Sequence, residues 1–138
     1  MSKPEVRSYE EFWPFYVRAH SKRLTRQVHF VGTASALACL AAFAITRRPR
    51  YLLLAPFAGY GPAWYSHFFI EGNVPATFGN PQWSLRGDFE MFVRMITGTM
   101  DAEVERHCRP EASPEAAERA PAEAAAPAVD ATPDPTLN

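Results

Sequence analysis

The sequence predicts an all-α membrane protein: an antiparallel transmembrane helical hairpin, flanked by amphipathic interfacial helices and followed by a disordered C-terminal tail. Two apolar runs carry this prediction, because residues 28–45 and 51–70 contain no formally charged side chain over 18 and 20 residues. A helix of about 20 residues covers the roughly 30 Å hydrocarbon core of a bilayer. The short basic segment at 47–50 separates the runs, so the two helices should lie antiparallel.

The chain has 138 residues, the length of one domain, and its composition changes near residue 108. All 18 aromatic residues lie between Tyr9 and Phe92. Residues 1–108 carry 12 basic and 9 acidic side chains, a net of +3, whereas residues 109–138 carry 2 and 6, a net of −4. The second segment is rich in Ala, Pro and Glu, and has too little apolar surface to offset its chain entropy. We therefore predict a helical membrane domain over 1–108 and a disordered tail over 109–138.

An amphipathic helix is predicted near the N-terminus. Ser8 and Glu11 have the spacing of a capping box. Four apolar side chains then recur on one face at helical intervals: Phe12, Phe15, Tyr16 and Ala19. Pro14 lies deep in this segment, so the helix should begin later or bend there.

The two apolar runs also fit a rival interpretation, in which they are the buried helices of a soluble bundle. Both runs lack a polar face, and a domain of about 100 residues rarely buries two helices on all sides. Small residues four apart, such as Gly32 and Ala36, suit close approach of helices in lipid. Pro62 should kink the second run. These features favour the membrane.

A last helix is predicted over roughly residues 85–107, which are amphipathic but too charged to span a bilayer. Five basic residues flank the hairpin on the side of the termini, against three in the turn. The excess favours cytoplasmic termini. A bacterial protein of this kind would be a multi-pass protein of the inner (cytoplasmic) membrane.

Three histidines should meet at one end of the hairpin. If residue 48 is the centre of the turn, His29 lies 19 residues before it and His67 lies 19 residues after it, so the two are level. His20 lies nine residues before His29, within reach of the same end. Glu71 follows His67 by four residues, on the same face of a continuing helix.

Imidazoles with a carboxylate suit Fe(II) or Zn(II), and two histidines with one carboxylate are typical of non-haem iron. Each of His20, His29 and His67, taken alone, is more simply explained as an interfacial or surface residue. Their predicted convergence is what indicates a metal site. His107 ends the last helix, where a cation favours the helix dipole, and is interpreted as structural.

Two sequence blocks resemble a known family: FYVRAHSKRLTRQVHFVGT at 15–33 and AWYSHFFIEGNVPATFGNPQWSLRGDFEMF at 63–92. They are similar to the two motif blocks of the 2-hydroxy-fatty-acid (2-hydroxy-palmitic acid) dioxygenase-like family, over about residues 9–100. Thirteen positions match: His20, Arg26, His29, Gly32, Trp64, His67, Glu71, Asn73, Pro75, Pro81, Trp83, Ser84 and Asp88. Thr25 stands where the family usually has Asn.

The resemblance implies an Fe(II)-dependent membrane dioxygenase of fatty-acid α-oxidation. A 2-hydroxy fatty acid and O₂ would give the fatty acid one carbon shorter, with CO₂ and water. The implied iron ligands are His20, His29 and His67, with Glu71 as a fourth ligand or as an acceptor that orients an imidazole. The implied substrate-binding residues are Arg26, Trp64, Asn73 and Asp88.

The substrate would supply all four electrons for O₂, and the sequence contains no nucleotide- or flavin-binding motif. The expected partners are the lipid bilayer, the 2-hydroxy acid and O₂. No nucleic acid is expected, and the protein could form a homo-oligomer. The alternative is a small non-enzymatic membrane scaffold or structural metal-binding protein, in which Glu71 and Asp88 hydrogen-bond to the histidines.

Overall fold

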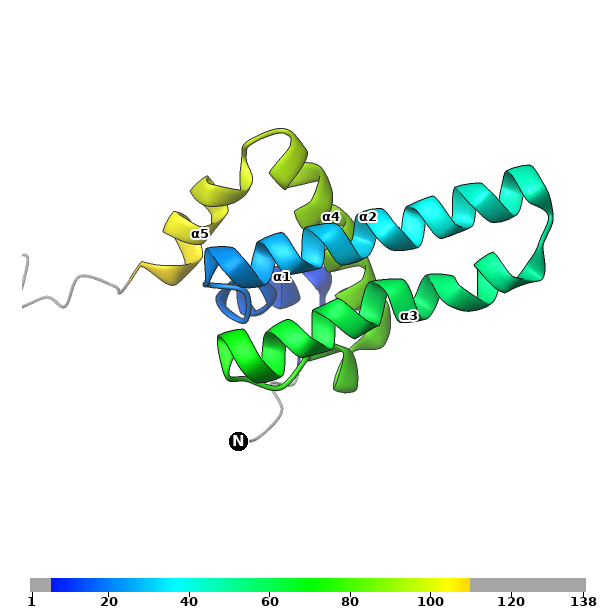
Figure 1. The fold of residues 1–138 in the computed structure, drawn as a ribbon. Coiled ribbons are helices and arrows are strands. Elements are labelled where there is room, and N and C mark those ends of the chain that lie inside the picture. The colour runs from blue at the N-terminus through cyan, green and yellow to red at the C-terminus, as the bar shows by residue number, and fades with distance from the viewer. Residues whose placement is uncertain (1–5, 110–138) are drawn as a thin grey trace, which may run out of the picture.

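A computed structural model describes residues 6–109, and all regular structure in that range is helical, which confirms the predicted all-α class. The elements in chain order are α1 (Tyr9–Arg18), α2 (Arg23–Thr46), α3 (Pro49–Tyr65), a π-helix η1 (Ser66–Glu71), a 3₁₀ helix η2 (Ala76–Phe78), α4 (Pro81–Ile96) and α5 (Met100–Cys108). The hairpin of α2 and α3 extends away from α1, α4 and α5 (Figure 1). The predicted tail from residue 110 onward lies outside the described residues.

The core lies where α1 packs against α4 and α5. Its buried apolar side chains come from all three helices and from η2: Phe12, Trp13, Tyr16, Val17, Ala76, Met91 and Met100. Ser8 accepts a hydrogen bond from the Glu11 backbone N–H at 3.3 Å and caps α1, as its spacing indicates. The helix does not begin later than Pro14: it starts at Tyr9 and contains the proline.

The α2–α3 hairpin turns at Arg47, whose φ of 54° places it in the left-handed region. Pro49 then begins α3, at the position where a missing N–H costs no helical hydrogen bond. The two helices approach closely at Gly32, because a Cβ atom there would lie 2.9 Å from the carbonyl oxygen of Gly59. A small residue is therefore needed at Gly32 for α2 and α3 to approach each other this closely.

Helix α2 has the length and composition of a membrane span, with a mean hydropathy of 1.9 over its most apolar window. Only 11 % of that window is buried, which is not the burial of a core helix in a soluble bundle. Helix α3 stays α-helical for 17 residues before η1 begins, and within residues 6–109 only α2 meets both the length and hydropathy criteria of a span. The hairpin exists as a pair of helices, and its insertion stays a prediction.

The predicted final helix over 85–107 is wrong in one respect, because two helices, α4 and α5, replace it. Gly98 has a φ of 72°, which ends α4 and redirects the chain into α5. Helix α4 also begins earlier than predicted, at Pro81, which occupies its first turn. The turn lets α5 pack against α1 and complete the core.

Candidate metal centre

Three buried histidines meet beside the core, and each comes from a different segment. His20 lies between α1 and α2, His29 lies near the start of α2, and His67 lies in η1. One ring nitrogen of each lies within 4.8 Å of those of the other two. The ring centroids are 4.5 to 5.0 Å apart in all three pairs. The structure therefore brings together His29 and His67, which the hairpin register places level, and His20, which was predicted to reach the same end.

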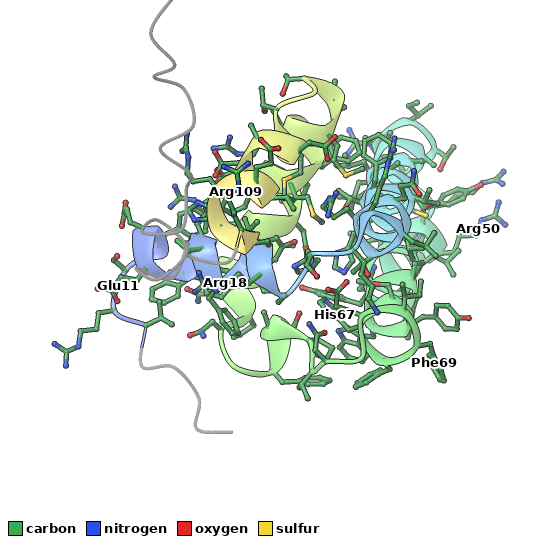
Figure 2. All side chains as sticks on the ribbon, turned by 90° about the vertical axis from the view of Figure 1, so that its left-hand side faces the viewer. Glu11, Arg18, Arg50, His67, Phe69 and Arg109 are labelled. Atoms are coloured by element: carbon green, nitrogen blue, oxygen red, sulfur yellow. The ribbon has the colours of Figure 1, made fainter. Side chains whose placement is uncertain are left out.

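The π-helix η1 determines how His67 points. His67 is 2 % exposed and faces the other histidines, whereas Phe69, two residues later, is 75 % exposed. Figure 2 shows His67 inside the molecule and Phe69 projecting from its surface. The carbonyl of His67 accepts the backbone N–H groups of Gly72 and Asn73, which ends the π-helix and turns the chain back toward the site.

Each imidazole has a hydrogen-bond acceptor on its Nδ1 atom. The three contacts are His20 to the Tyr16 carbonyl at 2.7 Å, His29 to Asp88 Oδ1 at 3.2 Å, and His67 to Asn73 Oδ1 at 2.7 Å. An acceptor at Nδ1 holds the ring proton there and leaves the Nε2 lone pair free. This is the arrangement that orients histidine ligands in metal sites.

The Nε2 atoms of His20 and His29 are buried and have no hydrogen-bond partner within the described residues. A buried polar atom left unpaired costs about 1–3 kcal/mol. Burial, together with the neighbouring His29 and His67, holds the pKa of His20 well below its usual range, so its ring is neutral and able to coordinate. Three imidazoles whose ring nitrogens lie this close together fit a divalent transition metal such as zinc or iron.

Tyr16 connects two of the three histidines, whereas the sequence assigned it only to the apolar face of the first helix. Its ring stacks on that of His20, with centroids 4.0 Å apart. Its hydroxyl donates to Asp88 Oδ1, the same oxygen that accepts from His29. Gly87 allows this contact, because a Cβ atom there would lie 2.9 Å from the Tyr16 ring. The signals in the sequence are Tyr16 four residues before His20 and a glycine directly before Asp88.

Glu71 contacts the start of α2 and not an imidazole. Its carboxylate accepts hydrogen bonds from the Ser21 backbone N–H at 3.1 Å, the Lys22 backbone N–H at 3.2 Å and the Thr25 hydroxyl at 2.5 Å. Burial opposes its charge, but the hydrogen bonds from Ser21, Thr25 and Lys22 outweigh that effect and hold the pKa of Glu71 below its usual range. Glu71 thus serves as an N-terminal cap for α2, supplied from another helix.

Arg26 is also turned inward. Its side chain is 5 % exposed, and its guanidinium donates to the carbonyls of His20 at 3.0 Å and Ser21 at 2.6 Å. The same group pairs with Asp101 at 3.2 Å. Arg26 therefore holds the loop that carries His20. Trp64 lies on the surface of α3 with its ring 5.2 Å from that of Phe78.

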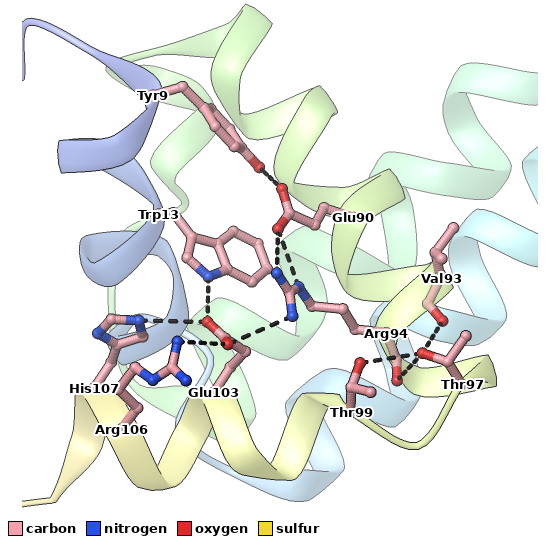
Figure 3. Close-up of polar contacts among 10 residues, drawn as sticks. All are labelled: Tyr9, Trp13, Glu90, Val93, Arg94, Thr97, Thr99, Glu103, Arg106 and His107. Carbon is pink, nitrogen blue, oxygen red and sulfur yellow. Dashed lines mark hydrogen bonds and ion pairs between the residues drawn. The ribbon is translucent and has the colours of Figure 1, made fainter.

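His107 lies away from this cluster, in a second polar network between α1, α4 and α5 (Figure 3). Its Nε2 lies 3.4 Å from Glu103, whose carboxylate also accepts the Trp13 indole N–H at 2.7 Å. Arg94 and Arg106 each lie 3.4 Å from the same carboxylate. Its place in a network that joins α5 to the core agrees with the structural interpretation of His107.

In a comparison with protein families, the family model described as 2-hydroxy-palmitic acid dioxygenase Mpo1-like matches residues 6–100. No curated protein and no solved structure matches the sequence. The matched range includes the three histidines and every acceptor on their Nδ1 atoms.

Proposed function

The chain belongs to the family described as 2-hydroxy-palmitic acid dioxygenase Mpo1-like, and on this premise we propose that it is an Fe(II)-dependent dioxygenase acting on 2-hydroxy fatty acids. The reaction breaks the bond between C1 and C2, releases C1 as CO₂ and oxidises C2 to the new carboxyl group. The substrate provides four electrons, which with its protons reduce O₂, so that one oxygen atom leaves as water. No further reductant is needed.

The observation that carries the proposal is the convergence of three buried imidazoles, two of them with unpartnered Nε2 atoms. His20, His29 and His67 would hold the iron. When bound, the iron would bring the 2-hydroxy acid and O₂ together and carry electrons between them. The carboxylate of Asp88 would accept the Nδ1 proton of His29 and make the His29 ring a stronger donor to the iron. Asn73 would keep His67 in one orientation.

The burial of the three histidines suits a reaction with O₂. His20 is fully buried beneath the Tyr16 ring, and His29 and His67 are also buried. Exclusion of water protects reactive intermediates from side reactions. Glu71 and Arg26 would act as positioning residues, because their contacts hold the start of α2 and the His20 loop. We thus assign them to the support of the site and not to direct substrate contact.

We further propose that α2 and the apolar run 51–70 of α3 and η1 insert into a membrane as a two-span hairpin, with Glu71 outside the second span. Large apolar side chains cover its outside, including Val31, Ile45 and Phe57, which are more than half exposed. Four aromatic residues near the histidine end, Trp64, Tyr65, Phe68 and Phe69, are exposed where aromatic side chains favour a membrane interface. In such a hairpin the histidines would lie near the depth of a fatty-acid head group, with the acyl chain in the bilayer.

Metal analysis of protein purified without oxygen tests the proposal, followed by O₂ uptake and product mass after addition of 2-hydroxypalmitic acid. We expect one iron per chain and a product one carbon shorter. Alanine at His20, His29 or His67 should abolish both iron retention and turnover, whereas His107→Ala, the matched control, should retain both. Tightly bound zinc without O₂ uptake would instead favour the structural metal-binding alternative.

If His67→Ala still binds iron stoichiometrically and still shortens the substrate, the assignment of the site is wrong. If all three alanine variants fail to accumulate while His107→Ala does accumulate, the histidines are structural and the scaffold alternative gains.

A further inference from the structure

An apolar groove runs along the hairpin from the histidine centre toward the α2–α3 turn, with a volume of about 280 Å³. Its polar end is formed by His29 and Asp88, which are hydrogen-bonded to each other. From there it follows α2 to Leu40 and α3 to Ala55. One end of the groove therefore reaches His29 of the candidate metal centre, whereas His20 and His67 do not line it.

The direction of the groove follows from the helix register. On α2, His29 and Leu40 are eleven residues apart, which corresponds to about 16 Å along the helix axis. On the antiparallel α3, Ala63 lies at the histidine end and Ala55 lies toward the turn. Leu85 and Phe89 of α4 cover the end nearest the histidines. The result is a long, narrow channel with one polar end.

Small residues of both helices line the groove and leave room in it. Ala55 and Ala63 are buried, at 6 % and 5 % exposed, yet both face this space. A Cβ atom at Gly59 would lie 3.4 Å from the Cβ atom of Ala36, so α2 and α3 are close together beside the groove. Leu40 is 41 % exposed, so the groove opens sideways near the turn. Such a shape suits one unbranched chain.

We infer that this groove binds the acyl chain of the substrate, with the carboxylate and hydroxyl at His29 and the chain directed toward Leu40 and Ala55, so that these two residues set the preferred chain length. The inference rests on the proposed function for the identity of the substrate. Its support is the contact of the groove with His29 of the histidine centre, its apolar walls and its single polar end. A volume near the lower end of ligand pockets, roughly 300–1,000 Å³, fits one chain.

Two reciprocal variants test the length-setting residues. Ala55→Leu fills the far end of the groove, so kcat/KM for 2-hydroxypalmitic acid should fall about tenfold or more, while that for 2-hydroxyoctanoic acid should change less than twofold. Each methylene group removed from water is worth about fourfold, or about 0.8 kcal/mol. Leu40→Ala should shift the preference toward longer chains. Ala41→Leu, on the exposed face of α2, is the matched control and should change neither substrate.

Photolabelling in the absence of oxygen measures binding independently of turnover. A 2-hydroxy fatty acid with a photoreactive diazirine near its methyl end should label residues around Leu40 and Ala55 in the full-length protein. Free 2-hydroxypalmitic acid should compete, and Ala55→Leu should reduce the labelling at these positions severalfold.

The outcomes separate this inference from the proposed function. If both variants turn over substrate with an unchanged chain-length preference, the groove does not bind the acyl chain. The same follows if labelling is confined to the exposed face near Val31 and Ile45. Neither result would contradict the proposed dioxygenase activity. Labelling that phospholipid displaces and 2-hydroxypalmitic acid does not would assign the groove to a membrane lipid, which also overturns it. Specific, competed labelling without any O₂ uptake would support the acyl groove and contradict the dioxygenase.

Discussion

Tyr16 and His20 lie stacked with their ring centroids 4.0 Å apart, and the Nδ1 atom of His20 donates to the carbonyl of Tyr16 at 2.7 Å. The Tyr16 hydroxyl donates to Asp88, which accepts from His29. One side chain of α1 thus orients the first histidine and supports the second. The metal centre depends on the packing of α1 against α4 as much as on the hairpin.

Removing the Tyr16 hydroxyl tests this dependence. In Tyr16→Phe the stack on His20 remains, but Asp88 loses one donor and holds His29 less firmly. We expect iron affinity to fall about tenfold, the lower end of what loss of such an outer contact costs. Tyr65→Phe removes an exposed hydroxyl and should change nothing. Metal titration of the two variants measures the effect, and equal affinities would mean that the Asp88 contact does not orient His29.

Asn73 should be as important for His67. Asn73→Ala removes the acceptor on His67 Nδ1 and the contact from its amide to the Ala19 carbonyl. The free ring can then rotate or take the other tautomer, so iron affinity should fall about 10- to 100-fold. Asn80→Ala is the control, because the Asn80 side chain makes no capping hydrogen bond on α4. If Asn73→Ala retained iron as well as Asn80→Ala, the orientation of His67 would have another cause.

Glu71 should contribute to stability in a pH-dependent way. Its pKa is lowered in the folded protein, so its contribution is fully present above the ordinary value of 4.5 and is lost as the pH falls through the folded value. Glu71→Gln should therefore lower the free energy of unfolding by about 1 kcal/mol at neutral pH, with the difference from the unmodified protein vanishing in acid.

Thermal unfolding in detergent at a series of pH values measures this difference. Glu105→Gln, at an exposed position of α5, should differ from the unmodified protein by less than about 0.5 kcal/mol. A Glu71→Gln deficit that stays constant down to acid pH would show that the charge of Glu71 is not what stabilises the start of α2.

The network around Glu103 should stabilise the fold without contributing to metal binding. Glu103→Ala leaves the Trp13 indole N–H and the Arg94 guanidinium without their shared acceptor (Figure 3). We expect the free energy of unfolding to fall by about 1–3 kcal/mol, while the folded fraction retains its iron. Glu105→Ala controls for the loss of an acidic side chain from α5. Loss of iron at full stability would contradict this separation.

The orientation of the hairpin is open to direct measurement. In a protein with Cys39 and Cys108 replaced by Ser, single cysteines at Arg7 and Arg48 report the two ends of the hairpin. A membrane-impermeant maleimide should label position 48 in intact cells and position 7 only after permeabilisation, since the basic flank favours the cytoplasm. Labelling of both positions from one side would mean that the hairpin does not span.

The sequence by itself determined the helical class and the equal height of His29 and His67 along the hairpin. The apolar runs and the cap at Ser8 act within a few residues, so their effects can be deduced from local spacing, whereas the start of α4 at Pro81 was not deduced. The equal distance of His29 and His67 from residue 48 is likewise a property of one hairpin. The break at Gly98 was missed, because a single glycine is compatible with either a continuous helix or a turn.

Only the tertiary structure decided the partners of each side chain. His29 meets Asp88 across 59 residues of chain, Tyr16 meets the same carboxylate across 72, and Glu71 reaches Thr25 across 46. The i, i+4 spacing of His67 and Glu71 suggested a shared face, but η1 changes the helical register and turns Glu71 toward α2 instead. Contacts of this kind depend on how α1 and α4 pack beside the hairpin, and local periodicity carries no information about that packing.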